Sequence, residues 1–478
     1  MELPVEPPLK RRALSALRDH EAALVLAPEE VERYHREGWL VPKVSLSKEK
    51  LERYQKTLDR VIAENPTVRP ELLVSAHVET KTKEGVVGNY DFLALAQEPM
   101  ILEAVGQVLG SDFALWGCQI FCKPGKDGME VPMHQDGEYW PIRPLATVTV
   151  WVALDRSDKG NGCLNVLPRS HTHGNLKHEP CEGRMVLSQR LTADELSRLE
   201  APVDVELDAG QMSMHDVYLV HGSNANGSGR RRAGVAFRYM PTSSLFDREM
   251  YDSDRAGFTI DWKKRSGRGR RGRPLFLLSG QDLSGGRNSY SPLPAPLAWP
   301  EGFQRASVAK SPKEWSALKR WMEECQEIPW EKAIEGRRVA QWGVRYDYTT
   351  QSVDLTPVLP IPPVLREIFP EVGAEFTQCI INEYGAQDAI PWHLDDLAFG
   401  PTVRVFVFGD PRPLLLRPLD GDGGTKTVEM RHLWSYSFSG PARYQWEHCV
   451  PTGQDRRWSV TFRSLAEGDA KNAPSMHS

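Results

Sequence analysis

The sequence has little that would mark a secreted or membrane-bound protein. Its 478 residues include only seven cysteines, scattered and without a Cys-x-x-Cys pair, so we expect reduced thiols and no disulfide framework. No run approaches the roughly 18 apolar residues of a membrane helix, and the N-terminus lacks the apolar core of a signal peptide. The net charge of -5 indicates no overall positive field for nucleic acid or a membrane surface. We therefore expect a soluble protein of the cytoplasm.

The length of the chain suits two domains of about 150 to 250 residues each. Between about residues 262 and 305 the composition shifts to Gly, Ser, Pro and Arg, which is typical of a linker. We expect a first domain over residues 1–295, a second over residues 310–467, and a short tail over residues 468–478.

The periodicity of apolar residues changes along each half. Ser47 and Ser311 can cap helices, and apolar residues at three- and four-residue spacing follow each. Short alternating or β-branched segments come later, separated by turns with Gly and Pro. The pattern predicts a mainly β protein with flanking helices (α+β), built from antiparallel barrels or sandwiches. Examples of these predicted strands are residues 147–152, 212–221, 404–409, 433–440 and 457–463.

The most informative pattern is His-x-Asp followed by a distant His and then Arg, and it occurs twice. Two imidazoles and one carboxylate on one face of an iron leave three coordination positions open, as in non-haem Fe(II) oxygenases. A downstream Arg can clamp a carboxylate of 2-oxoglutarate with two hydrogen bonds. The first set is His134, Asp136, His221 and Arg232, and the second is His393, Asp395, His448, Arg457 and Arg463.

In the first set, His134 and Asp136 point to the same face of a strand because side chains alternate along it. Arg232 lies eleven residues after His221, enough to turn and return along a neighbouring antiparallel strand. His215 competes with His221 for the ligand position, because it lies six residues earlier on the same predicted strand. It lacks the Gly-Ser that follows His221 and an Arg at the expected offset. His171, His173 and His178 cluster nearby, but we do not expect them to bind metal.

The first half resembles the phytanoyl-CoA dioxygenase family over roughly residues 25 to 295. The run from His134 to Pro144, then Trp151, then the run from Asn161 to His171 carry this resemblance. It implies a double-stranded β-helix (jelly-roll, cupin-like) with Fe(II) on His134, Asp136 and His221. It also implies that Arg232 holds 2-oxoglutarate, with Trp151 and Ser223 nearby. Asp136 fills the position that related halogenases leave open for chloride, which favours hydroxylation.

In the second set, even spacing places the polar side chains in pairs on one face of a strand. Arg457 and Arg463 are six residues apart and can both reach into a barrel. Asn382 and Tyr384 share a face in the same way and can hydrogen-bond a second carboxylate.

This second half, about residues 310 to 467, resembles the AlkB-like dioxygenases. The matching pieces are Asn382-x-Tyr384, His393-x-Asp395-Asp396, Arg443 to His448, and Arg457 to Arg463. The resemblance implies a second jelly-roll domain with Fe(II) on His393, Asp395 and His448. It further implies 2-oxoglutarate bound by Asn382, Tyr384, Arg457 and Arg463, and oxidative removal of alkyl groups from nucleic-acid bases. Leu397 stands where repair enzymes carry an acid that reads the base, and an apolar side chain discriminates bases poorly.

Two basic runs bear on a nucleic-acid partner. Residues 230–232 and Lys263–Arg273 could contact nucleic acid or direct the protein to the nucleus. The alternative is a solvated turn and a linker. Arg232 already has a role as the co-substrate clamp, and the second run lacks an aromatic residue on which bases could stack.

These patterns predict a fusion of two distinct Fe(II)- and 2-oxoglutarate-dependent dioxygenases, with one iron per domain and O2 as the second co-substrate. No side-chain acid or base is required beyond the metal ligands. The favoured reading is hydroxylation of a lipid-like or secondary-metabolite small molecule, with release of succinate and CO2. The alternative is a nucleic-acid demethylase with an auxiliary N-terminal domain, in the cytoplasm or the nucleus. A non-enzymatic scaffold is the third reading, and the oligomeric state stays open.

Overall fold

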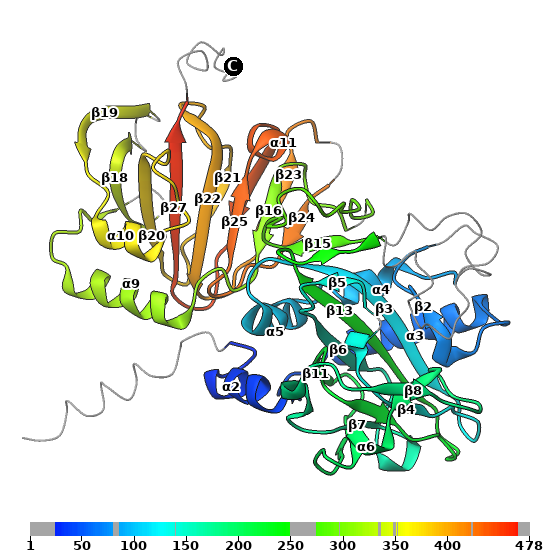
Figure 1. Cartoon of the computed structure of the whole chain (residues 1–478). Helices are drawn as coiled ribbons and strands as arrows, with labels where there is room; N and C mark the ends of the chain where they lie inside the picture. Colours follow the sequence, from blue (N-terminus) through cyan, green and yellow to red (C-terminus); the bar gives the residue numbers. More distant parts are fainter. Residues whose placement is uncertain are drawn as a thin grey trace, which may run out of the picture. The chain divides into compact units, whose positions relative to one another are not determined.

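A computed structural model describes residues 24–79, 86–138, 140–248, 274–295, 297–332, 336–347, 350, 352–421 and 424–466. The chain divides into two compact units, one spanning Val25–Ala298 and the other containing the chain from Trp299 onward (Figure 1). Both units are mostly β with few helices, as the sequence predicted. No helix within the described ranges is long and apolar enough to cross a membrane.

The helices of the N-terminal unit begin where the sequence supplies caps. Pro28 occupies the first turn of its helix, and the Ser47 side chain accepts a hydrogen bond from the Lys50 N–H. The Tyr239 hydroxyl donates to the Ala96 carbonyl oxygen, which ties the helical layer to the outer face of the large sheet. The helices are α2 (Pro28–Glu37), α3 (Lys48–Glu64), α4 (Tyr90–Leu95), α5 (Pro99–Leu109) and α6 (Ala193–Leu196).

The strands of the N-terminal unit form two main antiparallel sheets. The large sheet has the order β1 (Trp39–Leu40), β11 (Met212–Asp216), β6 (Val148–Ala153), β13 (Arg232–Pro241), β3 (Phe113–Lys123) and β15 (Phe276–Ser279), with β2 (Leu73–Val74) also pairing with β3. The small sheet has the order β10 (Val203–Val205), β7 (Leu164–Val166), β12 (His221–Ser223) and β4 (Val131–His134). Two short pairs complete the unit, β5 (Ile142–Arg143) with β14 (Leu245–Phe246) and β8 (His178–Pro180) with β9 (Gln189–Leu191).

The C-terminal unit also has a large and a small sheet. The large sheet has the order β16 (Phe303–Ala306), β25 (Ser435–Phe438), β22 (Phe399–Gly409), β27 (Arg457–Leu465), β20 (Gln378–Tyr384), β18 (Arg338–Asp347) and β17 (Glu331–Lys332), with β19 (Ser352–Leu359) pairing with β18. The small sheet has the order β21 (Ile390–His393), β26 (Trp446–Val450), β23 (Leu414–Pro418) and β24 (Lys426–Val428). The helices are α9 (Pro312–Glu324), α10 (Pro363–Ile368) and α11 (Gly440–Tyr444).

Eight strands follow the same path in both units. In the N-terminal unit β3, β6, β11 and β13 lie in the large sheet, while β4, β7, β10 and β12 lie in the small one. In the C-terminal unit β20, β22, β25 and β27 correspond to the first set, and β21, β23, β24 and β26 to the second. The lateral order is also shared, with β11-β6-β13-β3 matching β25-β22-β27-β20. Chains that alternate between two antiparallel sheets in this way are consistent with a jelly-roll.

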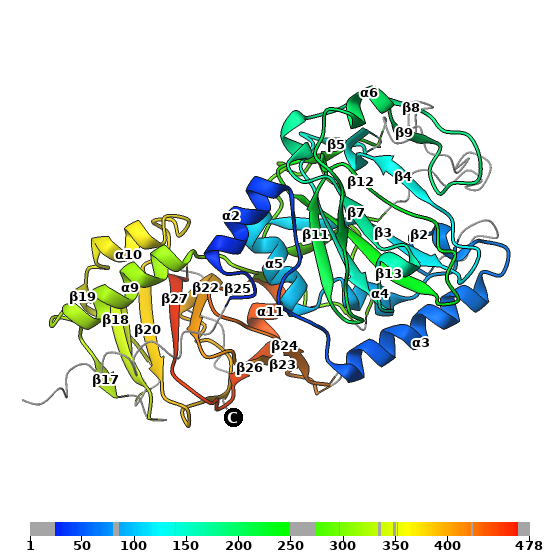
Figure 2. The same ribbon diagram turned by 90° about the horizontal axis from the view of Figure 1, so that it is seen from below.

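The apolar core of the C-terminal unit covers one face of its large sheet. Trp315 and Leu318 of α9 pack on Phe406 and Phe408 of β22, and the rings of Trp315 and Phe408 stack 4.8 Å apart. In Figure 2, α9 and α10 lie along this sheet. On β27 the residues with even numbers, such as Phe462, belong to this apolar layer. Arg457 and the other odd-numbered residues therefore face the opposite side, where the predicted site lies.

The lowered pKa of one buried histidine, His432, can be tested by the pH dependence of the protein's stability. Burial, with a smaller contribution from the Lys319 ammonium, lowers the pKa of His432 to about 4. The unfolded chain takes up a proton on this imidazole below about pH 6.5, whereas the folded chain does not until about pH 4. Stability must therefore fall on acidification, and His432 alone should cost about 2 kcal/mol between pH 7.5 and pH 5.

The His432→Asn variant should lose less stability over this interval, measured by urea unfolding at both pH values. Asn keeps an acceptor for the Gly409 N–H, which donates to His432 Nδ1 at 2.9 Å. An equal loss in wild type and variant would show that His432 titrates normally in the folded state.

Candidate metal and co-substrate sites

Three of the predicted metal ligands lie together in the N-terminal unit. His134 ends β4 and faces His221, the first residue of β12, across the antiparallel pair, with ring centroids 4.3 Å apart. Asp136 follows β4, and its Oδ1 lies 3.5 Å from His134 Nε2. Over the described part of the chain, these three are the one group of His, Cys, Asp or Glu with ligand atoms all within 4.8 Å of one another. The structure thus shows a His-Asp-His triad.

Both imidazoles present Nε2 to the carboxylate. His134 Nδ1 lies 2.8 Å from the Pro132 carbonyl oxygen, and His221 Nδ1 lies 2.9 Å from the Leu219 carbonyl oxygen. A carbonyl oxygen only accepts, so each Nδ1 carries the proton and donates. Nε2 therefore keeps its lone pair, which is how hydrogen bonds to backbone carbonyls usually orient metal-binding histidines.

The protonation states of His221 and Asp136 also suit a divalent metal. Burial, together with the neighbouring His134 and His215, lowers the pKa of His221 well below its ordinary value. Burial by itself would raise the pKa of Asp136, but the surrounding histidines and Arg238 outweigh it and hold this pKa well below its usual range. Neutral imidazoles and an ionised carboxylate are the forms that ligate metal. This donor set fits Fe(II) with open positions for further ligands.

His215 does not lie on the strand of His221, so that part of the sequence prediction is wrong. The chain turns after Asp216, which leaves His215 on β11 in the large sheet and His221 on β12 in the small one. His215 Nε2 nevertheless lies 3.8 Å from Asp136 Oδ2, and neither of its ring nitrogens has a hydrogen-bond partner among the described residues. The Thr149 hydroxyl donates to the same Asp136 oxygen at 3.5 Å. His215 is thus placed to orient the carboxylate rather than to replace a ligand.

The other clustered histidines lie outside the triad, as expected. His171 Nε2 lies 3.0 Å from the His35 carbonyl oxygen. His178 Nε2 accepts a hydrogen bond of 3.1 Å from the backbone N–H of Gln135, the residue between His134 and Asp136 in the sequence. His178 therefore supports the turn that carries His134 and Asp136.

Arg232, the predicted co-substrate clamp, is buried at the start of β13. It approaches from the large sheet, because β13 pairs with β3 and β6, and the expectation that it returns beside the strand of His221 is wrong. Its guanidinium donates to the Gly162 carbonyl oxygen at 2.6 and 2.9 Å. Burial lowers the pKa of Arg232 to about 10. The cost of holding this buried charge would fall if a carboxylate bound beside it.

Lys123 adds a second buried amine next to Arg232. The two residues lie directly opposite each other on β3 and β13, and Lys123 is 1% exposed. Its ammonium donates to the Ser223 carbonyl oxygen at 3.1 Å and to that of Asn224. Burial, and then the charge of Arg232, lower the pKa of Lys123 to about 6. Positive charge is therefore disfavoured here without an anion.

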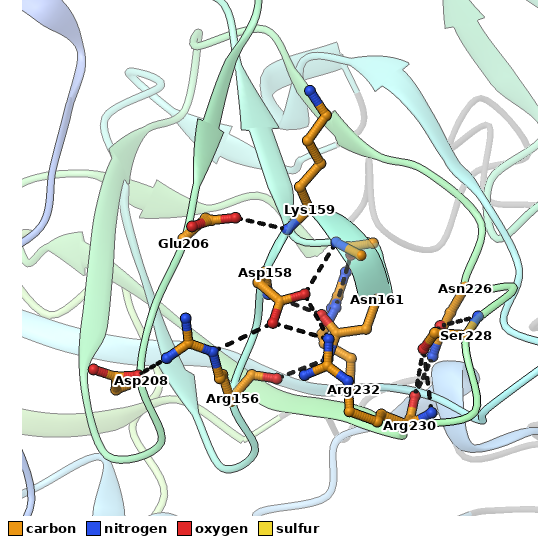
Figure 3. Close-up of polar contacts among 12 residues, drawn as sticks. Arg156, Asp158, Lys159, Asn161, Glu206, Asp208, Asn226, Ser228, Arg230 and Arg232 are labelled. Carbon is orange, nitrogen blue, oxygen red and sulfur yellow. Dashed lines mark hydrogen bonds and ion pairs between the residues drawn. The ribbon is translucent and has the colours of Figure 1, made fainter.

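The loop that carries Gly162 is fixed by its own hydrogen bonds (Figure 3). Asp158 accepts from the guanidinium of Arg230 at 2.8 and 3.0 Å and from the N–H of Gly160 at 3.0 Å. The Asn161 side chain accepts in turn from the Asp158 N–H at 2.8 Å. The loop therefore holds the carbonyl of Gly162 in place, which aims Arg232.

Trp151 and Ser223 lie near this pair of cations. The Arg232 Cζ lies 5.3 Å from the centre of the Trp151 ring, and Trp151 packs over Gly234, where an added Cβ would come within 2.0 Å of the indole. Ser223 lies on β12, two residues after His221. Contact of Trp151, Ser223 or Arg232 with 2-oxoglutarate stays a prediction.

The second set of predicted ligands also comes together, in the C-terminal unit. His393 of β21 lies opposite His448 of β26, with ring centroids 4.2 Å apart, and His448 Nε2 is 4.0 Å from Asp395 Oδ2. His393 Nδ1 lies 2.9 Å from the Pro391 carbonyl oxygen, the same arrangement as His134 with Pro132. The guanidinium of Arg463 donates a hydrogen bond to Asp395 Oδ1, so this carboxylate is already paired with a cation. A second iron site here stays a prediction.

Two of the predicted co-substrate residues of the C-terminal unit, Asn382 and Tyr384, contact the side chain of Ser459. Its hydroxyl lies 3.3 Å from Asn382 Nδ2 and 3.2 Å from the Tyr384 hydroxyl. Arg457 is fully buried opposite Tyr384, and its Nη1 donates to the Arg412 carbonyl oxygen at 3.1 Å. Burial lowers the pKa of Arg457, and its Nε has no partner among the described residues. This buried cation would also be stabilised by a carboxylate.

The basic run at residues 230–232 gives no support for a nucleic-acid partner. Arg230 pairs with Asp158, and Arg231 pairs with Asp155 and Asp59, so the charges of this run are neutralised locally. Leu397 is 41% exposed. The run Lys263–Arg273 lies outside the described residues.

Sequence reasoning missed three buried polar residues near the N-terminal triad. Gln135 is fully buried and donates to the carbonyl oxygens of Gly174 and Tyr218. Lys123 and Arg238 are the others, and each is a buried basic residue on a mostly apolar strand. That break in the apolar pattern was the signal that could have found them, because buried charges need a partner.

Two family models match the chain. Residues 34–234 match the model described as phytanoyl-CoA dioxygenase (PhyH), and residues 305–463 match that of the 2OG-Fe(II) oxygenase superfamily. Bovine (Bos taurus) peroxisomal phytanoyl-CoA dioxygenase is 28% identical over 234 residues, 45% of this chain and 68% of the relative. Ectoine dioxygenase of Bordetella bronchiseptica is 24% identical over 241 residues, 45% of this chain and 75% of the relative. The solved structure of the non-heme monooxygenase ThoJ aligns with a TM-score of 0.41 and 21% identity, over 61% of this chain and 93% of ThoJ.

The family matches and the triad together define the chain as an Fe(II)- and 2-oxoglutarate-dependent dioxygenase. In particular, it carries a PhyH domain in its first half and a 2OG-Fe(II) oxygenase superfamily domain in its second. The AlkB-like branch within that superfamily stays a prediction.

The role of His215 can be tested by metal titration. His215→Phe removes both ring nitrogens beside Asp136 and should weaken metal binding about 10- to 100-fold, as loss of a residue that orients a ligand usually does. Titration with Co(II), followed by its visible absorption, measures the affinity. His215→Gln should recover part of it. Unchanged affinity in His215→Phe, with an unchanged melting temperature of the metal-free protein, would exclude an orienting role.

The packing of Trp151 over Gly234 generates a second prediction. Gly234→Ala should destabilise the protein by about 1–3 kcal/mol, because the added methyl group overpacks the buried indole. The displaced ring should also raise the KM for 2-oxoglutarate. Gly227→Ala is the matched control, since an added Cβ there meets no atom within 4 Å. Thermal unfolding and initial rates at varied 2-oxoglutarate measure both effects, and equal KM values in the two variants would contradict the assignment of Trp151.

Proposed function

We propose that the protein is a two-domain oxygenase in which each domain holds one Fe(II) and 2-oxoglutarate. The proposed substrate is a lipid-like or secondary-metabolite small molecule, which becomes hydroxylated while succinate and CO2 are released. The observation that carries the proposal is the buried triad of His134, Asp136 and His221 in the same unit as the buried cation Arg232. A metal site beside a carboxylate site is what an oxo acid that chelates iron requires.

In the N-terminal domain, His134, Asp136 and His221 would hold the metal through two Nε2 atoms and one carboxylate. Arg232 would bind the distal carboxylate of 2-oxoglutarate, with Lys123 adding positive charge when that anion is present. Trp151 would pack on the co-substrate, and Ser223 would border it. Bound iron and 2-oxoglutarate would supply the oxidising chemistry, in which O2 is consumed and a C–H bond of the substrate is hydroxylated.

In the C-terminal domain, His393, Asp395 and His448 would hold the second iron, with Asn382, Tyr384, Arg457 and Arg463 around the co-substrate. The cross-strand pairing of His393 with His448 matches that of His134 with His221, which supports the same role. Release of Asp395 Oδ1 from Arg463 would accompany metal binding at that oxygen. We assign this domain to the AlkB-like branch on its motifs, but Leu397 and the ion-paired arginines favour a substrate other than a nucleic-acid base.

The names of the relatives support a small-molecule substrate. Phytanoyl-CoA dioxygenase and ectoine dioxygenase are both named for small molecules. The phytanoyl-CoA dioxygenase family model matches residues 34–234, which include the triad. The chain's own residues would then position this substrate and exclude water, since His134, Asp136 and His221 are all buried.

Succinate formation from 2-oxoglutarate tests this proposal. Wild type, His134→Ala and His393→Ala should be assayed with Fe(II), O2 and a panel of metabolites, and separately with methylated oligonucleotides. We expect His134→Ala to lose at least about 100-fold of the metabolite-stimulated succinate that belongs to the N-terminal domain, because one of three protein ligands is missing. His393→Ala should remove only the turnover that belongs to the C-terminal domain.

His173→Ala is the control for histidine loss, because His173 lies outside both predicted ligand sets. If only His393→Ala abolished product, and only with oligonucleotides, the protein would be a nucleic-acid demethylase. Unchanged succinate in both ligand variants would refute the oxygenase assignment.

A further inference from the structure

A row of three polar residues crosses the large sheet beside the N-terminal triad. His215 on β11 lies opposite Thr149 on β6, and Thr149 lies opposite Arg238 on β13. Directly paired residues on neighbouring strands point to the same face. Because His215 and Thr149 both approach Asp136, the row faces the triad, and Arg238 shares that face.

The C-terminal unit contains a corresponding row. Phe438 on β25 lies opposite Val403 on β22, and Val403 lies opposite Arg463 on β27. Phe438 packs on the proposed ligand His448 with ring centroids 4.7 Å apart, as His215 packs on His221 at 4.5 Å. Arg238 and Arg463 therefore occupy the same position, each six residues after the arginine that begins the last strand.

The two rows stabilise the ligand carboxylate in different ways. In the C-terminal row, Val403 and Phe438 cannot hydrogen-bond, and the guanidinium of Arg463 bonds directly to Asp395. In the N-terminal row, Thr149 and His215 supply polar atoms to Asp136 Oδ2 at 3.5 and 3.8 Å. Arg238 acts on Asp136 through its charge, but the carboxylate does not depend on it alone.

The surroundings of Arg238 suit a second anion. Its Nη2 donates to Gln119 Oε1 at 3.3 Å, and its Cζ lies 5.1 Å from the centre of the Trp140 ring. The Trp140 ring packs against that of Trp116, with centroids 4.6 Å apart, in a buried apolar cluster. Arg238 and Asp136 are both buried.

Arg238 and Arg232 contact different parts of the protein. They are six residues apart on one strand, which separates their Cα atoms by about 20 Å at the usual rise per residue. Arg232 is directed to Gly162, and Arg238 to Gln119 and Trp140.

We propose that Arg238, with Gln119 and the face of Trp140, binds a carboxylate of the primary substrate, so that the N-terminal domain hydroxylates a small carboxylic acid. This inference rests on the proposed function of that domain. A guanidinium offers a carboxylate two parallel hydrogen bonds, and the indole covers the adjacent carbon chain. The same anion chemistry could come from the metal end of 2-oxoglutarate, and the test below separates the two sources.

The test uses the full chain carrying His393→Ala, so that turnover reports on the N-terminal domain. Succinate formation is measured with pairs of aliphatic and aromatic carboxylic acids and their primary amides, which share size but not charge. We expect the acids to stimulate turnover more than the amides. Arg238→Met should lower kcat/KM for the best acid about 10-fold or more and remove the preference for acids over amides. Arg238→Lys should keep part of the preference.

The control is Arg198→Met, the same substitution at an exposed arginine that pairs with Asp194, and it should leave the preference unchanged. Melting temperatures identify variants that fail to fold, in which case Arg238→Lys and Arg238→Gln carry the comparison. Amides that stimulate as well as acids, or a panel in which no acid stimulates, would overturn the proposal. A raised KM for 2-oxoglutarate with an unchanged acid preference would assign Arg238 to the co-substrate instead.

Failure of the underlying function gives a different result. In that case the chain forms no succinate that depends on His134, with or without added acid, and does not bind Co(II) at the triad.

Discussion

The antiparallel pairing of β4 with β12 is the constraint on which the N-terminal site depends. It sets His134 opposite His221, and the carbonyl oxygens of Pro132 and Leu219 then turn both Nε2 atoms toward Asp136. A slip of one residue in this register would send an imidazole to the opposite face of the sheet. The pairing of β21 with β26 imposes the same constraint on His393 and His448. Metal-binding geometry thus follows from backbone hydrogen bonds.

Charge buried near these paired strands accounts for the rest of the site. Arg232, Lys123 and Arg238 are nearly inaccessible, and burial lowers the pKa of Arg232 and of Lys123. Such cations are stable when an anion joins them, so their positions mark where carboxylates are expected. The two units share one strand order and differ in these side chains, above all where His215 in one corresponds to Phe438 in the other.

Much of the fold and the site could be predicted because it depends on short-range patterns. The capping residues predicted α3 and α9. The His-x-Asp spacing predicted that His134 and Asp136 lie together, although Asp136 lies in a 3-10 turn after β4 rather than on a strand. Sheet membership could not be predicted in the same way. The turn after Asp216 separates His215 from His221, and β13 carries Arg232 in the opposite sheet from β12. Both depend on pairing with strands distant in sequence, which local periodicity does not encode.

By itself, the sequence determined which donor types are present: each His-x-Asp, with its later His and Arg, offers two imidazoles, one carboxylate and one cation. It also determined that the pattern occurs twice. Tertiary structure alone decided which polar side chains surround each carboxylate: His215 and Thr149 at Asp136, and Arg463 at Asp395. The physical reason is that these neighbours meet across strands and sheets, where contact depends on register and packing rather than on distance along the chain.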